Sequence, residues 1–204
     1  MKNLNLNSLR IFSFNVNCNY AVMETSLVTL GKHVIGAPIH PNWIYLAPSL
    51  PSPVKPWVMA YVHKHLSYLQ PSLINSYTDL DRDILILSLS YNQNVHFLMN
   101  VYSDNKHLTL DHLQQCVNLL PLLLYAGRDF NIRSKEWDAN CHTHSKHAIH
   151  LMDIMTDLGL DLSIPIVDIP TRYSTDPTKN NTTIDLMFTA NEVDIDGHYI
   201  LPEY

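Results

Sequence analysis

Glycine, cysteine and charged residues are all scarce in this chain of 204 residues. There are only 5 glycines against 12 prolines, a balance that favours many short elements joined by proline-marked loops. The three cysteines, Cys18, Cys116 and Cys141, are odd in number and show no paired spacing. This excludes a disulfide framework and favours a reducing compartment.

Segments that would direct the chain to a membrane are also lacking. The first residues, MKNLNLNSLR, contain no apolar core of a signal peptide. The longest apolar stretch, residues 119–126, is interrupted by Pro121 and is far too short to span a bilayer. We therefore expect an intracellular protein, nuclear or cytoplasmic, that is not secreted and has no membrane partner. Nothing in the sequence fixes its oligomeric state.

A basic composition, typical of proteins that bind duplex DNA, is missing as well. Charged residues make up 16% of the chain, and the net charge is −6 with histidine neutral. This balance argues against tight, nonspecific binding to DNA. It does not exclude a phosphodiesterase, because an acidic metal site contributes negative charge of its own.

Apolar residues make up 46% of the chain, enough to fill the core of a single domain covering residues 1–204. Runs rich in β-branched and aromatic residues predict strands, and apolar residues at helical spacing predict helices. The short polar link at residues 91–93 predicts a hairpin. Alternating strands and helices predict one layered α/β or α+β domain. The expected strands are residues 9–16, 42–47, 57–64, 83–90, 94–102, 122–126 and 183–188, and the expected helices are residues 21–32, 109–120 and 145–160.

The strongest candidate for chemistry is the segment YAGRDFN, residues 125–131, where an apolar strand runs into polar residues. Alternation along an extended segment puts Asp129 and Asn131 on the same side. A carboxylate and an amide at the end of a strand can accept a proton from water and hydrogen-bond a phosphate oxygen. The competing interpretation is an ordinary Asx turn after a strand, and these two residues taken alone favour it.

Three weaker candidates also place a polar residue on an expected strand. Asn15 and Asn17 share a face, where their amide oxygens can reach Mg²⁺ or its waters, although a plain loop is the simpler interpretation. Tyr102 is either a hydrogen-bond donor to phosphate or a core aromatic residue. Asp185 lies between apolar neighbours, so its carboxylate needs a partner. It can orient a histidine or satisfy nearby backbone groups.

Taken in order, these segments resemble the endonuclease/exonuclease/phosphatase superfamily, in the fungal-type branch carried by non-LTR retrotransposons. The family pattern is N-x-N or N-x-D, a Q-E strand, N-x-Y, G-D-x-N, P-T, I-D and S-D-H. The run GRDFNIRSKEWD, residues 127–138, is similar to the G-G-D-F-N-x-H-x-x-x-W-D of retrotransposon-type members. The match covers nearly the whole chain and rests on Asn15-Val16-Asn17, Asn100-Val101-Tyr102, Asp129-Phe130-Asn131, Pro170-Thr171 and Ile184-Asp185.

The resemblance implies a fold, a cofactor, a substrate and a role for each matching residue. The fold would be a four-layered α/β sandwich of the DNase I-like type. The activity would be Mg²⁺- or Mn²⁺-dependent cleavage of phosphodiester bonds in DNA. The implied roles are Asp129 to position or deprotonate the attacking water, Asn131 and Tyr102 to hold the phosphate, Thr171 to contact substrate, Asn15 and Asn17 to belong to the metal site, and Asp185 to orient the catalytic histidine.

The chain departs from the family pattern in three places. Residues 18–34 have room for a helix but not also for the Q-E strand, since both with their loops need roughly 25 residues. Glu24 falls in that helix and does not replace a ligand at a strand's end. Asp196 and His198 do not match the order or spacing of S-D-H. Arg128 stands where the family has a glycine, a residue that permits positive φ. Its guanidinium either clashes there or binds phosphate.

These departures predict a sandwich without one core strand and a degenerate or weakly active nuclease. A second hypothesis is a non-catalytic remnant of the fold that binds a protein or a nucleic acid. A third is a metal-binding protein, because cysteine and histidine are the ligands that Zn²⁺ takes. The residues that suggest it are Cys141, His142, His144, His147 and His150, whose spacing matches no standard finger.

Overall fold

The computed structural model describes residues 41–48, 57–74, 83–163, 170–174 and 176–193. The expected strand at residues 9–16, the helix at residues 21–32 and the missing Q-E strand all lie outside these ranges. So do the proposed metal ligands Asn15 and Asn17.

A six-stranded sheet forms the centre of the described fold, with strand order β3-β4-β5-β6-β8-β7. Strands β5 and β6 run parallel and every other neighbouring pair runs antiparallel. The crossover between the two parallel strands passes through helix α2. The strands are β3 (Ser72–Leu73), β4 (Ile84–Tyr91), β5 (Asn94–Val101), β6 (Leu123–Asp129), β7 (Leu160–Leu162) and β8 (Asp185–Ala190).

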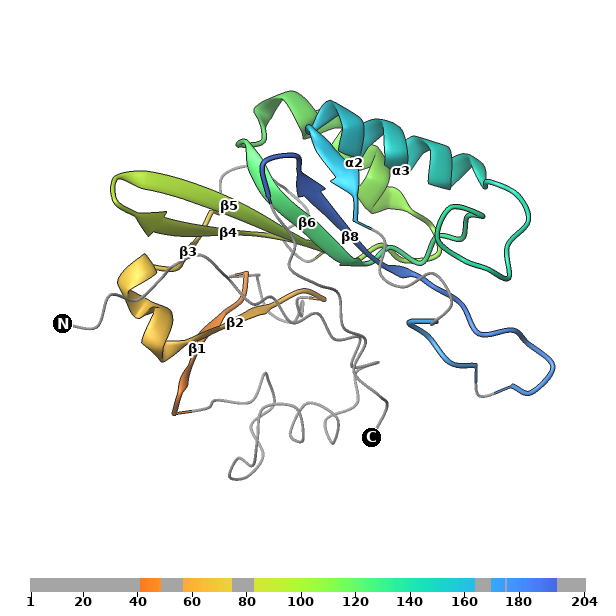
Figure 1. The fold of residues 1–204 in the computed structure, drawn as a ribbon, viewed down its shortest axis with the longest axis horizontal. Coiled ribbons are helices and arrows are strands. Elements are labelled where there is room, and N and C mark those ends of the chain that lie inside the picture. Colours follow the sequence, from red (N-terminus) through yellow and green to blue (C-terminus); the bar gives the residue numbers. More distant parts are fainter. Residues whose placement is uncertain (1–40, 49–56, 75–82, 164–169, 175, 194–204) are drawn as a thin grey trace.

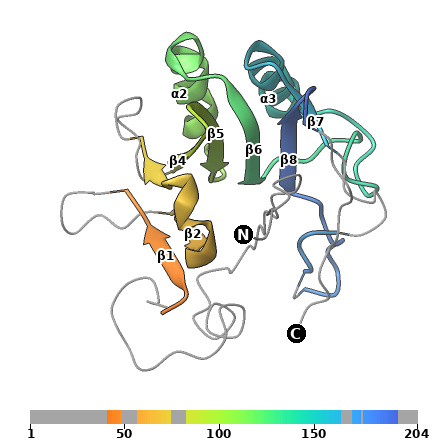
Figure 2. The same cartoon turned by 60° about the vertical axis from the view of Figure 1, so that its left-hand side comes forward.

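The central sheet lies between a helical layer and a second, smaller sheet. Helices α2 (Leu108–Cys116) and α3 (Lys146–Asp157) lie together over one face (Figures 1 and 2). On the other side lie β1 (Trp43–Leu46) and β2 (Ala60–His63), which pair antiparallel. This layering confirms the expected α/β sandwich.

Strand β4 shows why the two faces have separate cores. Its residues alternate, so Ile84 and Ile86 join the core under the helices while Leu85, Leu87 and Leu89 join the core facing β2. A strand buried on both faces is a continuous apolar run, which explains the sequence ILILSL. The helix-side core also contains the largest fully buried side chains, among them Trp137, Phe130, Phe188 and Met99.

The expected elements that fall within the described residues are confirmed in type, and their boundaries differ for identifiable reasons. Helix α2 stops at Cys116, and the short 3-10 helix η2 (Val117–Leu119) follows, because Pro121 disfavours helical backbone at Leu120. Helix α3 begins as expected: the Ser145 side chain accepts a hydrogen bond from the Ala148 amide. It ends before Gly159, whose φ is +71°.

Other parts of the fold were not predicted from the sequence. Of the strand expected at residues 57–64, only Ala60–His63 form a strand, β2. The 3-10 helix η1 (Lys64–Leu69) follows it. The last strand, expected at residues 183–188, is shifted by two residues to β8. Strands β3 and β7 have only two and three residues, too few for a periodic pattern to reveal them.

Candidate active site

Three strands bring the family-motif residues to one end of the six-stranded sheet. Parallel strands β5 and β6 both finish at this end, and antiparallel β8 begins there. We call it the carboxylate end and define it by Tyr102, Asp129, Asn131, Thr171 and Asp185. The motifs are separated by up to 83 positions in the chain, and the sheet topology brings them together.

Two carboxylates face each other across neighbouring strands at this end. Asp129 and Asp185 are direct cross-strand partners in the β6–β8 ladder. Leu186 and Phe188 pack under the helices, so alternation turns Asp185 to the opposite face of the sheet. Asp129 is only 6% exposed. Like charges placed directly opposite one another destabilise a sheet, so the fold maintains an unfavourable pair here.

The electrostatics of Asp185 reflect this arrangement. Burial, and then the charge of Asp129, raise the pKa of Asp185 to about 7, against smaller opposing effects of a Thr171 hydrogen bond, Arg128 and Arg172. Within the described residues, the Oδ1 atom of Asp185 is buried and has no hydrogen-bond partner. The apolar neighbours of Asp185 predicted that its carboxylate needs a partner, and among the described residues one of its oxygens is available for one.

Thr171 holds the start of β8 in place. Its hydroxyl oxygen accepts hydrogen bonds from the backbone amides of Ile184 and Asp185, both at 3.0 Å. The neighbouring residue Arg172 forms an isolated antiparallel bridge with Thr182. Thr171 therefore fixes the position of the Asp185 backbone, a contact that the motif did not reveal.

The expected extended geometry of Asp129 and Asn131 is wrong. Strand β6 ends at Asp129, and Asn131 has a φ of +51°. The Asn131 amide donates to Asp129 Oδ1 at 3.1 Å, which is the Asx turn considered as the alternative. The turn still brings the two residues together, because asparagine tolerates left-handed backbone more readily than most residues.

Ser103 connects strand β5 to both residues of this turn. Its backbone amide donates to the Asp129 carbonyl at 2.9 Å, and its own carbonyl accepts from Asn131 Nδ2 at 2.9 Å. Its fully buried hydroxyl lies 3.1 Å from His107 Nδ1. Burial, and then the neighbouring His147, lower the pKa of His107, whose ring centroid is 4.3 Å from that of His147. Ser103 was not predicted, since an isolated serine after a strand carries no recognisable signal.

Tyr102 lies beside an aromatic residue from the other sheet layer. Its ring stacks on Trp57, with centroids 5.1 Å apart and planes inclined by 12°. Its backbone carbonyl accepts a hydrogen bond from the Thr109 hydroxyl at 3.2 Å. Two residues earlier, Asn100 Nδ2 donates to the Met59 carbonyl at 3.0 Å and links the layers. Trp57, which sequence analysis assigned only to a strand, therefore contributes to the carboxylate end.

The residues before Asp129 explain the glycine pattern of the family motif. The side chain of Tyr125 folds over Gly127, where its hydroxyl would collide with any Cβ. Burial raises the pKa of this hydroxyl to about 12. Arg128 has a φ of +120°, a conformation that favours glycine, which is the residue the family places there. The backbone at Arg128 is therefore strained.

The cysteine and histidine residues of the zinc hypothesis are not assembled into a site. Among the described residues, no group of three or more potential metal-ligating side chains lies close enough to hold an ion. His144 instead contacts Ser134 at 2.9 Å and Glu136 at 3.4 Å. The Cys141 thiol donates to the Thr143 carbonyl at 3.2 Å. These contacts hold the loop between β6 and α3.

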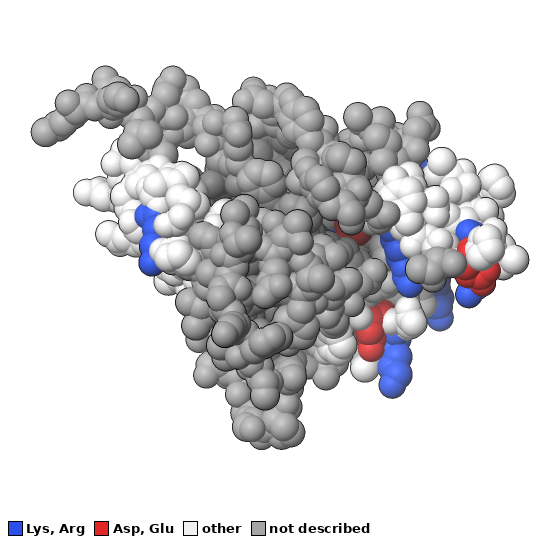
Figure 3. Space-filling model, turned by 90° about the horizontal axis from the view of Figure 1, so that it is seen from below, with Lys and Arg blue, Asp and Glu red and all other residues white. Residues whose placement is uncertain are grey.

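The described surface has no broad basic patch on the face seen in Figure 3, where basic and acidic side chains lie intermixed, mostly on one side. Within the part of the chain that the structure describes, every helix is too short or too polar to cross a membrane. The intermixing of basic and acidic side chains on the face in Figure 3 agrees with the net charge of −6.

Just over half of the chain, residues 96–203, matches the family model described as endonuclease-reverse transcriptase. The chain belongs to this family. Among solved structures, the endonuclease domain of TRAS1, a telomere-specific non-LTR retrotransposon, is 16% identical over 75% of this chain and 69% of that one, with a TM-score of 0.58. It has the same DNase I-like fold.

More distant is a hairpin-deletion mutant of beta toxin from Staphylococcus aureus. It is 11% identical over 65% of this chain and 60% of that one, and its TM-score of 0.31 supports no argument. No curated protein sequence matches the chain significantly.

Proposed function

We propose that this chain is a metal-dependent phosphodiester hydrolase of the retrotransposon endonuclease type, acting on DNA, with low activity. The observation that carries the proposal is the pair of buried Asp129 and half-buried Asp185, which face each other, with one oxygen of Asp185 lacking a partner among the described residues. A pair of opposed acids is costly for stability and is a common feature of sites that handle protons or cations. The family membership favours a nuclease over other uses of such a pair.

Each residue at the carboxylate end has a proposed task. Asp129 positions the attacking water and accepts its proton, since it is the last residue of β6 and lies at the carboxylate end of the sheet. Asn131 and Tyr102 donate hydrogen bonds to the phosphate. The Asx turn and the Ser103 carbonyl hold Asn131 in one orientation, and Trp57 holds the Tyr102 ring. Such fixed donors stabilise charge without having to reorganise.

Thr171 and Arg128 contact the substrate in this proposal. Thr171 lies where β8 begins, beside Asp185, and its backbone hydrogen bonds hold it there. Arg128 follows the strained path of β6 next to the carboxylates, and its guanidinium suits a phosphate group. Asp185 would orient a histidine by its free oxygen, as the resemblance implies.

The donor set at this end fits a hard divalent cation such as Mg²⁺ or Mn²⁺. The carboxylates of Asp129 and Asp185 supply oxygen ligands, and a nearby positive ion would relieve the repulsion between them. Asn15 and Asn17 are the further ligands that we propose. When bound, the ion would neutralise negative charge on the phosphate.

The proposed activity is low because groups that the family relies on are absent. The sequence between Asn17 and Ile35 has no room for the strand that carries the Glu ligand. Within the described residues, no histidine meets the free oxygen of Asp185. Losing an electrostatic or acid–base group commonly lowers the rate by ~10²–10⁴-fold.

A plasmid-nicking assay with Mg²⁺ or Mn²⁺ tests the proposal. The expected result is slow nicking, close to background, that Asp129→Ala abolishes and that the exposed control Asp161→Asn leaves unchanged. Nicking that survives Asp129→Ala would overturn the proposed site. Complete inactivity together with retained DNA binding would instead favour the non-catalytic binding module.

A further inference from the structure

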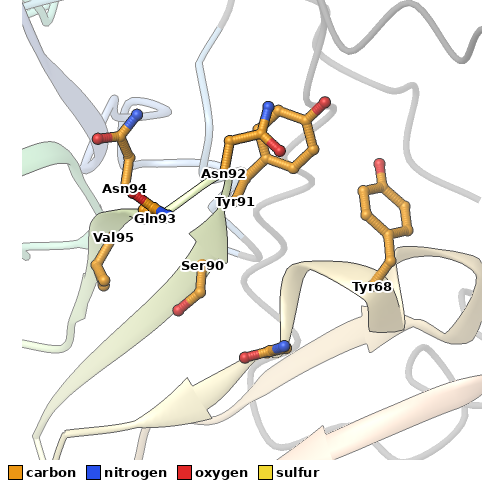
Figure 4. A pocket seen from close by; sticks show the side chains of 8 residues that line it. Tyr68, Ser90, Tyr91, Asn92, Gln93, Asn94 and Val95 are labelled. Carbon is orange, nitrogen blue, oxygen red and sulfur yellow. The ribbon is translucent and has the colours of Figure 1, made fainter.

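A second concave site lies at the other end of the six-stranded sheet, at the tip of the β4–β5 hairpin (Figure 4). It is a cavity of about 510 Å³, which we call the hairpin pocket. The hairpin tip is the Tyr91–Asn94 pair, and the opposite end of β5 leads into Tyr102. At about 3.4 Å per residue, the eight-residue strand places the pocket roughly 24 Å from the carboxylate end. The pocket is lined by Tyr68, Gln70, Ser90, Tyr91, Asn92, Gln93, Asn94 and Val95.

The lining is neutral, aromatic and rich in amides. None of the eight residues is acidic or basic, and four of them are Asn or Gln. Tyr68 and Tyr91 are 39% and 38% exposed, and their ring centroids lie 6.5 Å apart with planes inclined by 77°. Tyr68 stands on η1 and Tyr91 at the end of β4, with Asn92 beside it (Figure 4). The pocket thus offers aromatic surfaces and groups that both donate and accept hydrogen bonds.

Three lining residues have backbone conformations that favour glycine. Gln70, Asn92 and Gln93 have φ values of +47°, +47° and +69°. Two-residue hairpin turns with positive φ usually use Asn-Gly, and this chain has Asn-Gln instead. Asn92 is the usual residue at the first position, so Gln93 is the turn residue that keeps an amide side chain where glycine would relieve strain. Strain of this kind is concentrated at functional sites.

We propose that the hairpin pocket binds an unpaired nucleobase of single-stranded DNA. A nucleobase is planar and uncharged, stacks on aromatic rings and presents hydrogen-bonding edges that match amide groups. A phosphate group fits less well, because none of the described residues that line the pocket is a cation. A sugar would also stack on tyrosine. The choice of DNA over a sugar rests on the proposed function, since the carboxylate end lies on the same sheet, about seven base pairs away at 3.4 Å per pair.

Fluorescence anisotropy with a short labelled oligothymidylate, in the presence of EDTA, tests the proposal without any cleavage. The Tyr68→Ala/Tyr91→Ala double variant should bind about 10- to 100-fold more weakly, since stacking contributes ~1–3 kcal/mol per base. The matched Tyr68→Phe/Tyr91→Phe variant keeps both rings and should bind nearly as well as the unmodified protein. The loss should persist at high salt, because it involves no phosphate contact.

An abasic oligonucleotide of the same length is the second probe. The unmodified protein and both double variants should bind it equally and weakly. Equal binding of the abasic and thymidylate probes by the unmodified protein, or equal thymidylate binding by the Ala variant, would overturn the proposal. So would a neutral oligosaccharide that binds the pocket when the oligothymidylate does not. Because no metal or cleavage is involved, failure here leaves the proposed hydrolase untouched.

A chemical-shift titration guards against a variant that fails to fold. Adding thymidine to the unmodified protein should shift the backbone amides of Ser90 and Val95, and should leave that of Asn131 unmoved. Shifts confined to other parts of the chain would contradict the pocket assignment. The Gln70→Ala variant removes one amide while keeping both rings, and it should weaken thymidine binding without changing the melting temperature by more than a small amount.

Discussion

The two ends of the six-stranded sheet differ in charge and exposure, although strand β5 runs from one to the other. At the carboxylate end, buried Asp129 opposes half-buried Asp185, and desolvation, followed by the charge of Asp129, raises the pKa of Asp185 to about 7. At the hairpin pocket, the lining is neutral and its tyrosines are more than a third exposed. The carboxylate end therefore holds negative charge that other groups must stabilise, whereas water can solvate the exposed tyrosines of the hairpin pocket.

Backbone strain occurs at both ends, and this limits what the strain can mean. Arg128 has positive φ beside the carboxylates, and Gln70, Asn92 and Gln93 have it at the hairpin pocket. Positive φ alone therefore does not identify a catalytic site. The carboxylate end is distinguished by the combination of strain with a buried, unpartnered carboxylate oxygen.

The largest expected effect comes from restoring the groups missing from the carboxylate end. A family Gln-Glu strand inserted after Leu30, together with a family S-D-H strand added after Tyr204, should raise plasmid nicking at least ~10²-fold. The reason is that Asp129 and Asn131 act on a metal and a phosphate that must already be in place. Initial nicking rates with Mg²⁺ measure the change.

Two controls connect that gain to this end of the sheet. Adding Asp129→Ala to the grafted variant should return nicking to background, whereas adding the exposed control Asp161→Asn should leave the rate unchanged. A grafted variant no faster than the unmodified chain would contradict the explanation by missing groups. Robust nicking by the unmodified chain, abolished by Asp129→Ala, would contradict low activity while keeping the site.

A smaller but measurable effect concerns the pH dependence of stability. The native pKa of Asp185, about 7, is above its unfolded value of about 3.8, so the native state binds the proton more tightly. The free energy of unfolding should therefore fall as the pH rises from about 4 to about 7, and Asp185 should add no further change above that. Each pKa unit corresponds to ~1.4 kcal/mol, so the penalty above pH 7 is a few kcal/mol.

Urea denaturation across this pH range measures the effect. Asp185→Asn keeps the shape and removes the titration, so it should be more stable than the unmodified chain by a few kcal/mol above pH 7, with no gain below about pH 4. The exposed control Asp161→Asn should keep the original slope. A slope unchanged by Asp185→Asn would show that another group causes the pH dependence.

Motif order predicted the carboxylate end well because its residues are chemically distinctive and sit at strand ends. Asp129, Asn131 and Asp185 lie at one end of the sheet, although an Asx turn rather than an extended strand brings Asn131 to Ser103. Asn15, which was expected at the same end, lies outside the described residues. Parallel pairing of β5 with β6 is non-local, and periodicity alone does not specify it. The strands were found because their apolar runs are long, while their exact ends depend on turns and caps.

The hairpin pocket could not be predicted from the sequence in the same way. The hairpin itself was expected from its polar link. Tyr68 lies in η1 and Gln70 directly follows it, and no sequence pattern predicted this element. Their approach to Tyr91 depends on the core between the sheets, where Leu69 packs with the leucines of β4. Tyrosine and glutamine at a surface are individually unremarkable, and only their three-dimensional grouping makes a site.

A further, smaller effect on the free energy of unfolding is expected from the strained backbone at Arg128, at the carboxylate end. Arg128→Gly should be more stable than Arg128→Ala, by about 1–3 kcal/mol, because alanine keeps a Cβ at the φ of +120° and glycine does not. Both variants lose the guanidinium, so the difference between them isolates the backbone. Chemical denaturation gives the two values. Equal stabilities would show that the positive φ at this position carries no cost.

The smallest effect on stability is expected from the same glycine-versus-alanine comparison at Gln93, in the hairpin pocket. Gln93 occupies the second position of the two-residue turn with a φ of +69°, where glycine is the usual residue. Gln93→Gly should therefore stabilise the protein by roughly 0.4–1 kcal/mol relative to Gln93→Ala, less than at Arg128 because the turn is exposed and can relax. The same substitution removes one amide from the pocket, so oligothymidylate should bind more weakly to Gln93→Gly although the fold is more stable. Opposite signs for stability and binding are expected only if the strain is retained for a ligand. A Gln93→Gly variant that gains stability and binds unchanged would indicate that the turn is merely a suboptimal hairpin, and the nucleobase would then depend on the tyrosines alone.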